Sequence, residues 1–310
     1  MSGNNKRINY ACLALAYCDK RPIDGVKSVG FSLSRKISNI YGRGTSNPAA
    51  SYGQTPEIEF SYSSHITATQ GLVDFSQEAG LADYVSFDMM IGSDTATYLS
   101  TPIQTVRASH MLLTSLTYNL GVDGLPSIDR TFVGWHKTSN CGNGLGRTAP
   151  STGIVLNRAA FQDANSSLPA IVTNNILQNI KITININRSF VNEFGTRKPY
   201  ASYINFPIET SCTFDVVLTN SLDSFNFDAL QTACKTGPVL TENLKIGACV
   251  GPPIQINKAY LTSFNYSGAE AQNNGDNLKL SLVYTGYQSP SGIEPVTYLD
   301  DEELSDPCSC

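Results

Sequence analysis

The residues of this chain that could do chemistry are few and scattered along the sequence. Three histidines and eight cysteines are possible zinc ligands, but zinc needs its ligands clustered at short spacings. The chain has no Cys-x-x-Cys pair, and His136 with Cys141 is the one combination close enough to consider. We therefore predict no metal site and no cofactor. We expect the cysteines to be free thiols, buried as small hydrophobic side chains in a reducing cytosol.

Motifs for nucleophilic catalysis and phosphate binding are incomplete. Ser109 and His110 are adjacent on a segment expected to be extended, where neighbouring side chains point to opposite faces, so they make a poor nucleophile and base. Residues 142–146 lack the lysine and the spacing of a nucleotide-binding loop and are typical of a flexible linker. Asp123 and Asp129 lie in a turn region, where carboxylates are ordinarily solvated. These patterns predict no catalytic residue, and we interpret the chain as a protein that is not an enzyme.

The charge of the chain is low and slightly negative. Charged residues make up 15% and hydrophobic residues 41%, with a formal net charge of −5. Low charge with ordinary apolar content suits a protein whose surface is covered by neighbours, and it equally suits a polar, neutral soluble protein. No segment concentrates Lys and Arg among aromatic residues, which argues against specific nucleic-acid binding. A weakly negative surface still suits a channel through which nucleic acid slides without sticking.

Length and hydropathy limit the organisation of the chain. Its 310 residues suffice for two ordinary domains, each with its own core. No apolar run reaches the length of about 18 residues that a membrane-spanning helix needs, so we expect no membrane association. Residues 6–18 imitate a short signal peptide, but Asn9 interrupts the apolar stretch and the bulky Tyr17 precedes Cys18. We therefore expect no export.

Alternation of apolar and polar residues, rather than a helical period, governs the sequence, and the same alternating module occurs twice. Val29, Phe31 and Leu33 begin the first copy, and Ile182, Ile184 and Ile186 begin the second at an offset of 153. Residues 113–118 align with 261–266 at an offset of 148, and residues 132–135 align with 284–287 at an offset of 152. Three blocks in the same order predict a tandem duplication.

Each module is predicted to contain the same elements in the same order. A first strand ends at Arg35 or Arg188 and leads into a long loop or hairpin arm, then a second strand, a helix and a closing pair of strands. In the first copy the predicted ranges are 36–56 for the arm, 57–62 for the second strand, 70–84 for the helix, and 112–119 and 130–135 for the closing strands. In the second copy they are 189–207 for the arm, 209–216 for the second strand, 225–234 for the helix, and 259–267 and 278–287 for the closing strands. A Gly-rich linker at 137–175 includes a possible strand at 154–156. The domains are therefore predicted at 1–150, with a core at 26–137, and at 151–310, with a core at 179–289 and an acidic C-terminal tail.

The second module resembles the tail tube (major tail) proteins of tailed bacteriophages, in their duplicated-domain form. The resemblance lies in Ile182-x-Ile184-x-Ile186-x-Arg188, Phe194-Gly195, Pro199-Tyr200, Tyr203, Phe206-Pro207-x-Glu209 and Cys212-x-Phe214. It implies a mainly β fold with two small β-barrel or sandwich domains, each with a flanking helix and a long arm. It also implies that six modules form a ring, that rings stack into a tube conducting the genome, and that a two-module chain builds the ring as a trimer with pseudo-sixfold symmetry.

The resemblance implies partners and contact residues as well. The partners would be other copies of the chain, the sheath, terminator and baseplate proteins, and DNA that passes without specific binding, in a virion tail assembled in the host cytoplasm. The candidate subunit-interface residues are Arg35, Tyr41, Tyr52, Arg188, Phe194, Arg197, Tyr200 and Tyr203. For the arginines the alternative is a solvated position at a strand end, and for the arms it is an ordinary surface loop.

Two other functions remain open at this point. The same fold could form another virion ring, at the neck, the tail terminus or the baseplate. A two-domain β-sandwich could instead bind glycans, and it would then need an aromatic-lined groove, for which Tyr200 and Tyr203 are available.

Overall fold

The structure is a computed structural model. It describes residues 13–17, 22–44, 46–53, 56–67, 84–91, 104–139, 166–173, 175–194, 199–219, 241–247, 254–267, 278–288 and 296–298. Four predictions lie outside these residues: the two helices, except Tyr84 just before a strand, the possible strand at 154–156 and the glycine-rich run 142–146.

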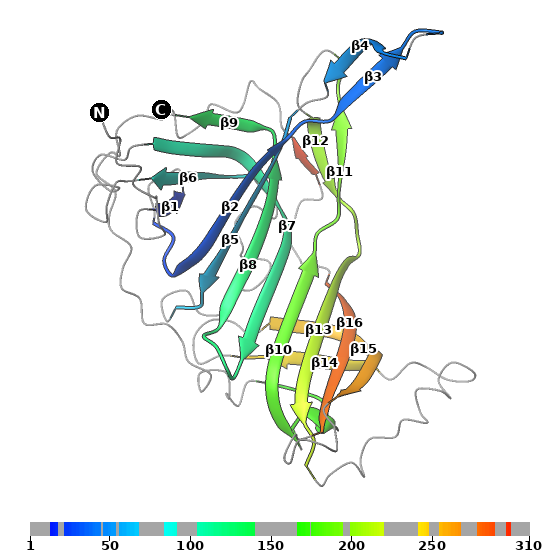
Figure 1. Ribbon diagram of the computed structural model, residues 1–310. Coiled ribbons are helices and arrows are strands. Elements are labelled where there is room, and N and C mark those ends of the chain that lie inside the picture. Colours follow the sequence, from blue (N-terminus) through cyan, green and yellow to red (C-terminus); the bar gives the residue numbers. More distant parts are fainter. Residues whose placement is uncertain are drawn as a thin grey trace.

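The described chain is built almost entirely of β-strands (Figure 1), and the prediction of a mainly β fold is confirmed. The strands of the first half are β1 (Leu13–Tyr17), β2 (Val26–Ser34), β3 (Ile37–Tyr41), β4 (Pro48–Gly53), β5 (Glu57–His65), β6 (Val85–Ile91), β7 (Gln104–Gly121), β8 (Ser127–Gly134) and β9 (His136–Ser139). The second half contains α1 (Ala170–Thr173), β10 (Ile176–Asn185), β11 (Arg188–Asn192), β12 (Pro199–Ile204), β13 (Ile208–Val217), β14 (Thr241–Ile246), β15 (Ile254–Ser267), β16 (Lys279–Gln288) and β17 (Val296–Tyr298).

The strands form where the sequence alternates. In β5, Ile58, Phe60 and Tyr62 are buried, while Glu57 and Glu59, which alternate with them, are exposed. The same period of two runs through β13, where every second residue from Ile208 to Val216 is buried. Such a pattern places one face of a strand on the core and the other toward solvent. The predicted first, second and closing strands of each module are all present, in most cases longer than predicted.

Most of these strands belong to one large antiparallel sheet. Its strand order is β14-β15-β16-β13-β10-β7-β8-β5-β2, with β6 and β9 paired to the first part of β7 and β1 paired to β6. Two small sheets accompany it, one made of β3 and β4 and one made of β11, β12 and β17. In Figure 1 the large sheet runs without a break from the first half of the chain into the second. That each half of the chain forms its own barrel or sandwich therefore remains a prediction.

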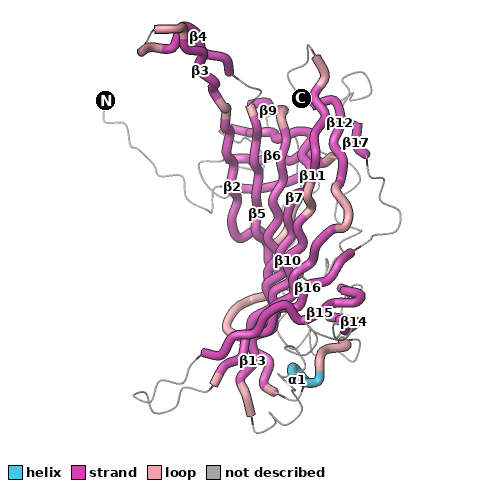
Figure 2. The backbone as a smooth tube through the Cα atoms, turned by 90° about the vertical axis from the view of Figure 1, so that its right-hand side faces the viewer, coloured by secondary structure: helices cyan, strands magenta, loops and turns pink. Residues whose placement is uncertain are grey.

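The two predicted arms are β-hairpins. β3 pairs with β4, and β11 pairs with β12, in both cases antiparallel. The β3–β4 hairpin is largely exposed and projects beyond the end of the large sheet that lies away from β14 and β15 (Figures 1 and 2). The left-handed residue in its turn is Gly44, with a φ of 85°, which a glycine adopts at little cost.

The two halves of the chain repeat one pairing scheme. The order β6-β7-β8-β5-β2 in the first half has the same form as β14-β15-β16-β13-β10 in the second. The register agrees as well: Leu113 faces Phe132 and Leu261 faces Tyr284, and each pair is followed by a bulge on its first strand. These are the positions that the offsets of 148 and 152 equate. For the closing strands, sequence alignment and strand pairing thus identify the same equivalent residues.

For β2 and β10, sequence alignment and strand pairing differ, because Phe31 is joined through Phe60 to Phe132 as Ile182 is joined through Cys212 to Tyr284. The strand pairing therefore equates these two strands at an offset of 151 instead of 153, and Arg188 begins β11 instead of ending the first strand.

Local backbone details repeat in the same way. His110 and Lys258 are equivalent, and each has a positive φ, of 56° and 52° respectively. The N–H of His110 donates to Ser86 Oγ, and the N–H of Lys258 donates to Asn243 Oδ1. A positive φ is unusual for residues other than glycine, so its recurrence with the same type of hydrogen bond reflects a shared bend of the two strands. The division at residues 150 and 151 itself stays a prediction, because that junction lies outside the described residues.

The bulges are fixed by equivalent hydrogen bonds. Thr114 Oγ1 donates to the carbonyl of Thr131 over 3.1 Å, and Thr262 Oγ1 donates to the carbonyl of Val283 over 2.9 Å. In each case the threonine is the extra residue of the bulge. Its hydroxyl supplies a donor to the neighbouring strand at the point where the ladder is interrupted.

The core of the first half contains two features that sequence patterning did not predict. Four aromatic residues, Phe60, Tyr62, Phe87 and Phe132, pack with ring centroids 4.8 to 6.5 Å apart. Arg107 on β7 makes a two-pronged ion pair with Asp88 on β6, with N–O distances of 2.7 and 3.0 Å, and both residues are buried. β6 was not predicted, although Val85, Phe87 and Met89 alternate with Ser86 and Asp88; the structure buries both of these polar residues.

Candidate assembly interface

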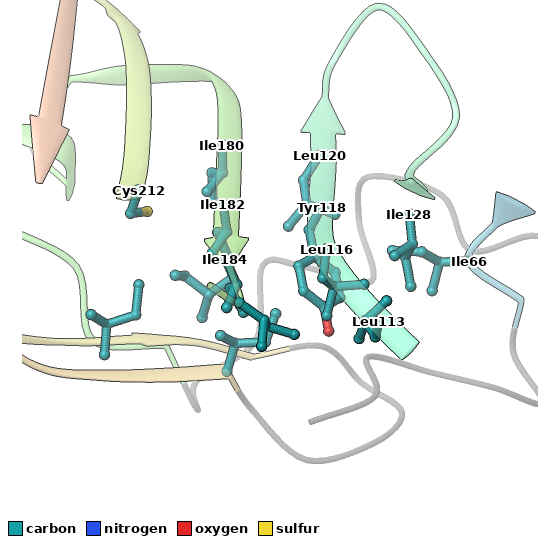
Figure 3. Packing of buried hydrophobic residues seen from close by; sticks show 14 of the residues in the cluster. Ile66, Leu113, Leu116, Tyr118, Leu120, Ile128, Ile180, Ile182, Ile184 and Cys212 are labelled. Atoms are coloured by element: carbon teal, nitrogen blue, oxygen red, sulfur yellow. The ribbon is translucent and has the colours of Figure 1, made fainter. Parts of the chain in front are cut away.

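The two halves of the chain meet edge to edge where β10 pairs with β7. This pairing, here called the seam, is antiparallel and joins residues 179–185 to residues 115–121. Ile182 lies opposite Tyr118 and Ile184 opposite Leu116, and all four side chains are fully buried. Figure 3 shows these apolar side chains of β10 and β7 in the same packed layer. The seam thus has backbone hydrogen bonds together with a continuous apolar face, as within one sheet.

Arg188 extends the seam beyond the strands. The N–H of Ile186 donates to the carbonyl of Thr114 over 2.8 Å, and Arg188 Nε donates to the carbonyl of Leu113 over 3.0 Å. Arg188 Nη1 also lies 3.4 Å from Ser202 Oγ on β12. Burial lowers the pKa of Arg188 to about 10, so the guanidinium remains charged at neutral pH. Of the candidate interface residues, Arg188 therefore joins the two halves of one chain.

The β11–β12 arm lies over the other half of the chain. Phe190 on β11 packs edge to face on Trp135, which follows β8, with ring centroids 4.7 Å apart. Both rings border the buried pair Leu112 and Val133. An arm from one half therefore covers the end of the closing hairpin of the other half. This arm therefore contacts the other module of the same chain and is not an ordinary surface loop.

Replacing Arg188 by methionine tests the contribution of the seam to stability. The variant Arg188→Met leaves the carbonyl of Leu113 without its donor, and we expect a loss of about 1–3 kcal/mol in the free energy of unfolding. Urea denaturation followed by circular dichroism measures the loss. The control is Arg35→Met, at an exposed arginine beside the other arm, where we expect a change within about 0.5 kcal/mol at concentrations that keep the chain monomeric. Equal losses in the two variants would contradict this role of Arg188.

The other candidate interface residues lie on the arms and are not brought into the seam. Tyr41, Tyr52, Phe194 and Tyr203 are exposed, as is Arg35, whose guanidinium lies beside Gly53 at the base of the β3–β4 hairpin. Tyr200 is partly buried on β12, and Arg197 lies outside the described residues. Contact of these residues with other subunits stays a prediction.

Sequence reasoning missed the residues that actually form the seam. Leu116, Tyr118, Phe190 and Trp135 were assigned to strands and arms but not to an interface. The signal that could have found them is the repeat itself, because a module that pairs with its own duplicate must use two different edges. Phe264 and Tyr266, the equivalents of Leu116 and Tyr118, are large apolar residues that remain partly exposed on β15.

The residues considered for chemistry do not form a reactive site in the described part of the chain. Ser109 is fully buried, which closes its hydroxyl to a substrate, and Asp129 accepts a hydrogen bond of 2.8 Å from the Asn119 side chain. Cys212 is a free, buried thiol whose pKa is raised by burial, as expected for a structural cysteine. His136 lies in β9, whereas Cys141 falls outside the described residues.

Ligand-binding features are correspondingly sparse. The described residues contain no group of three or more His, Cys, Asp or Glu side chains that could hold a metal ion. Among the same residues, no helix is long and apolar enough to cross a membrane. A pocket beside the β7–β8 turn is lined by the residues Gly121, Val122, Asp123, Gly124, Gln178, Asn179, Asp215, Val216, Ser267, Lys279, Leu280 and Ser281. This lining contains no aromatic ring, so the pocket is not the aromatic-lined groove that a glycan-binding module would need.

Comparison with known proteins gives the chain no relative. No protein-family model matches it, and no curated protein matches it.

Proposed function

We propose that this chain is a virion structural protein that polymerises as stacked rings to form the tail tube of a tailed bacteriophage. Three chains would supply six modules to each ring, giving it pseudo-sixfold symmetry. The tube would conduct the genome, with other copies of the chain and the sheath, terminator and baseplate proteins as its partners. The protein would assemble in the host cytoplasm and act in the virion tail, and we infer no enzymatic activity.

The observation that carries the proposal is the seam. Two halves with the same strand order, register and bulges are joined edge to edge by β10 and β7. A module that uses two different edges to bind its own duplicate makes a head-to-tail contact, and repeating such a contact generates a closed ring or an open filament. The chain therefore already contains one step of a repeating assembly.

Edge pairing also has a physical reason to continue between chains. A sheet edge presents backbone N–H and C=O groups that can template pairing with another strand, and closure of the sheet removes this aggregation hazard. The described strand order ends at β2, a strand of nine residues. A ring would cover such an edge in every subunit. The low charge of the chain, 15% of residues, is consistent with a surface that neighbours cover.

Negative-stain electron microscopy of the purified full-length chain tests the proposal. We expect rings at high protein concentration and stacked rings or rods when tail components that nucleate assembly are added. Averaged end views should show six similar lobes, because each chain would contribute two modules. A protein that stays monomeric under both conditions, by sedimentation velocity as well as by microscopy, would overturn the proposal.

Another ring in the virion, at the neck, tail terminus or baseplate, is compatible with the same seam. The copy number separates it from the tube, since a tube needs many tens of chains per particle and a single ring needs only a few. Quantitative mass spectrometry of purified virions gives this number. A few copies per particle would assign the chain to a single ring.

A further inference from the structure

We propose that neighbouring copies of this chain join by pairing β2 of one copy with β15 of the next, in the same antiparallel register that β10 makes with β7 inside the chain. This inference rests on the proposed ring function and specifies the contact through which it would occur. The seam is its template, because β2 is equivalent to β10 and β15 is equivalent to β7.

The register follows from the equivalent positions. Inside the chain, Thr183 lies opposite Thr117 and Asn185 lies opposite Ser115. The strand-pairing offset of 151 for β2 and the offset of 148 for β15 convert these pairs into Ser32 opposite Asn265 and Ser34 opposite Ser263 of the next copy. The same conversion turns the buried pairs of the seam into Phe31 opposite Tyr266 and Leu33 opposite Phe264.

The exposure of these side chains identifies a second copy as the occupant. Leu116 and Tyr118 have 0% of their surface exposed in the seam, whereas their equivalents Phe264 and Tyr266 are each 39% exposed. On the other strand, Ile184 is 0% exposed and its equivalent Leu33 is 54% exposed. Positions that the seam buries are therefore exposed where the same strands face outward, and both sides keep large apolar residues there. Burial of such residues is the main favourable term in association.

The two arginines do not lie at equivalent points of the structure. Arg35 is in the link that follows β2, whereas Arg188 is the first residue of β11 and corresponds to Ile37, the first residue of β3. The contact between copies therefore depends on the strands and their apolar side chains.

The arm would make the outermost contact. Phe190 of the β11–β12 arm packs on Trp135, and the corresponding features are the β3–β4 arm, which begins at Ile37, and Tyr287 at the end of β16. Ile37 and Tyr287 are both exposed, and the Tyr287 hydroxyl lies 3.3 Å from that of Tyr260. The β3–β4 arm would therefore lie over the two tyrosines of the next copy, as the β11–β12 arm lies over the closing hairpin of the first half.

Exposed residues of the two strands provide a cysteine cross-linking test with internal controls. Ser32, Ser34, Ser263 and Asn265 are exposed, and directly opposite residues on antiparallel strands have Cα atoms about 4.5–5.5 Å apart, within reach of a disulfide. We expect Ser34→Cys with Ser263→Cys, and Ser32→Cys with Asn265→Cys, to form disulfides between copies under mild oxidation. The displaced pairs, Ser34→Cys with Ser267→Cys and Ser28→Cys with Ser263→Cys, are shifted by about four and six residues, about 13 and 20 Å along the strand, and should not cross-link.

Non-reducing gel electrophoresis and mass spectrometry of the linked peptides read the result, and the unsubstituted protein sets the background of its own cysteines. Mixing two single variants, Ser34→Cys and Ser263→Cys, should give dimers only, because β2 and β15 lie at different ends of the sheet. Cross-linking of the displaced pairs at the same yield as the matched pairs would overturn the register.

Substitutions at the apolar positions test the same contact without new cysteines. The double variant Phe264→Ser with Tyr266→Ser should abolish ring formation while the monomer still melts cooperatively. The control Leu125→Ser changes an equally exposed apolar residue in the β7–β8 turn and should leave assembly unchanged. Unchanged assembly in the Phe264 and Tyr266 variant would overturn the contact.

These outcomes separate the contact from the function. Rings without the matched cross-links would reject the β2–β15 contact and leave the ring function in place. Matched cross-links in filaments or small oligomers that never close would support the contact and reject the ring. Neither cross-links nor assembly would reject both.

Discussion

Replacing Asp88 by alanine is expected to lower the free energy of unfolding by about 3–5 kcal/mol, because the change leaves the buried Arg107 guanidinium without its counter-charge. Asp88 is 0% exposed and holds Arg107 through two hydrogen bonds. An uncompensated charge in this position would have to be hydrated or moved. Urea denaturation of the monomeric variant, followed by circular dichroism, measures the loss.

The matched control removes both charges together. The double variant Asp88→Leu with Arg107→Met replaces the ion pair by apolar side chains, which is often neutral or stabilising. We expect it to recover most of the stability that Asp88→Ala loses. A double variant as unstable as the single one would show that the two side chains act through their separate contacts and not as a pair.

Truncation of Phe132 is expected to have an effect of similar size. Its ring stacks on Tyr62 with centroids 6.0 Å apart and meets Phe87 edge to face at 4.8 Å. Phe132→Ala opens a cavity among side chains that the large sheet holds in place, and we expect a loss of about 3–5 kcal/mol. Thermal and urea denaturation of the purified variant measure this loss.

The same substitution on β15 serves as its control. Phe264 is partly exposed, so Phe264→Ala should cost the monomer much less, while it weakens assembly if β2 of a second copy covers this position. Comparable destabilisation of the monomer by both variants would mean that Phe132 is not held in a close-packed cluster.

The strands were predictable because one face of each is buried. In β5 and β13 the alternation of apolar and polar residues is nearly complete, and it identifies both the strand and its inward face without any knowledge of the partners. The hairpin form of the arms was left open between loop and hairpin. Their glycine, proline and serine content marks turns but does not decide whether the flanking segments pair.

In β6 and the first part of β7, alternation does not give the burial that the structure shows. The alternating pattern puts Asp88 and Arg107 at polar positions, yet the two residues face each other across these strands and are both buried. Read separately, each charged residue indicates an exposed position. The ion pair compensates the buried charge of each residue, and it forms only when the two strands are aligned.

The candidate interface shows the same division. Arg188 was singled out because an arginine recurs at the position of the first module that the sequence alignment equates with it. Of the candidate residues, it is the one that contacts the other half of the chain. Phe190 and Trp135 were not singled out, because they are 55 positions apart in the sequence and nothing local links an arm to the end of a distant hairpin.

The sequence by itself determined the β class, the strands with a buried face and the residue equivalences of the closing strands of the duplication. Each of these depends on local periodicity or on comparison of one segment with another. Only the tertiary structure decided that β10 pairs with β7, which edges remain outermost and how Asp88 and Arg107 are satisfied. Strand pairing is a choice among edges far apart in the chain, and its free energy comes from contacts that exist only after the strands have aligned.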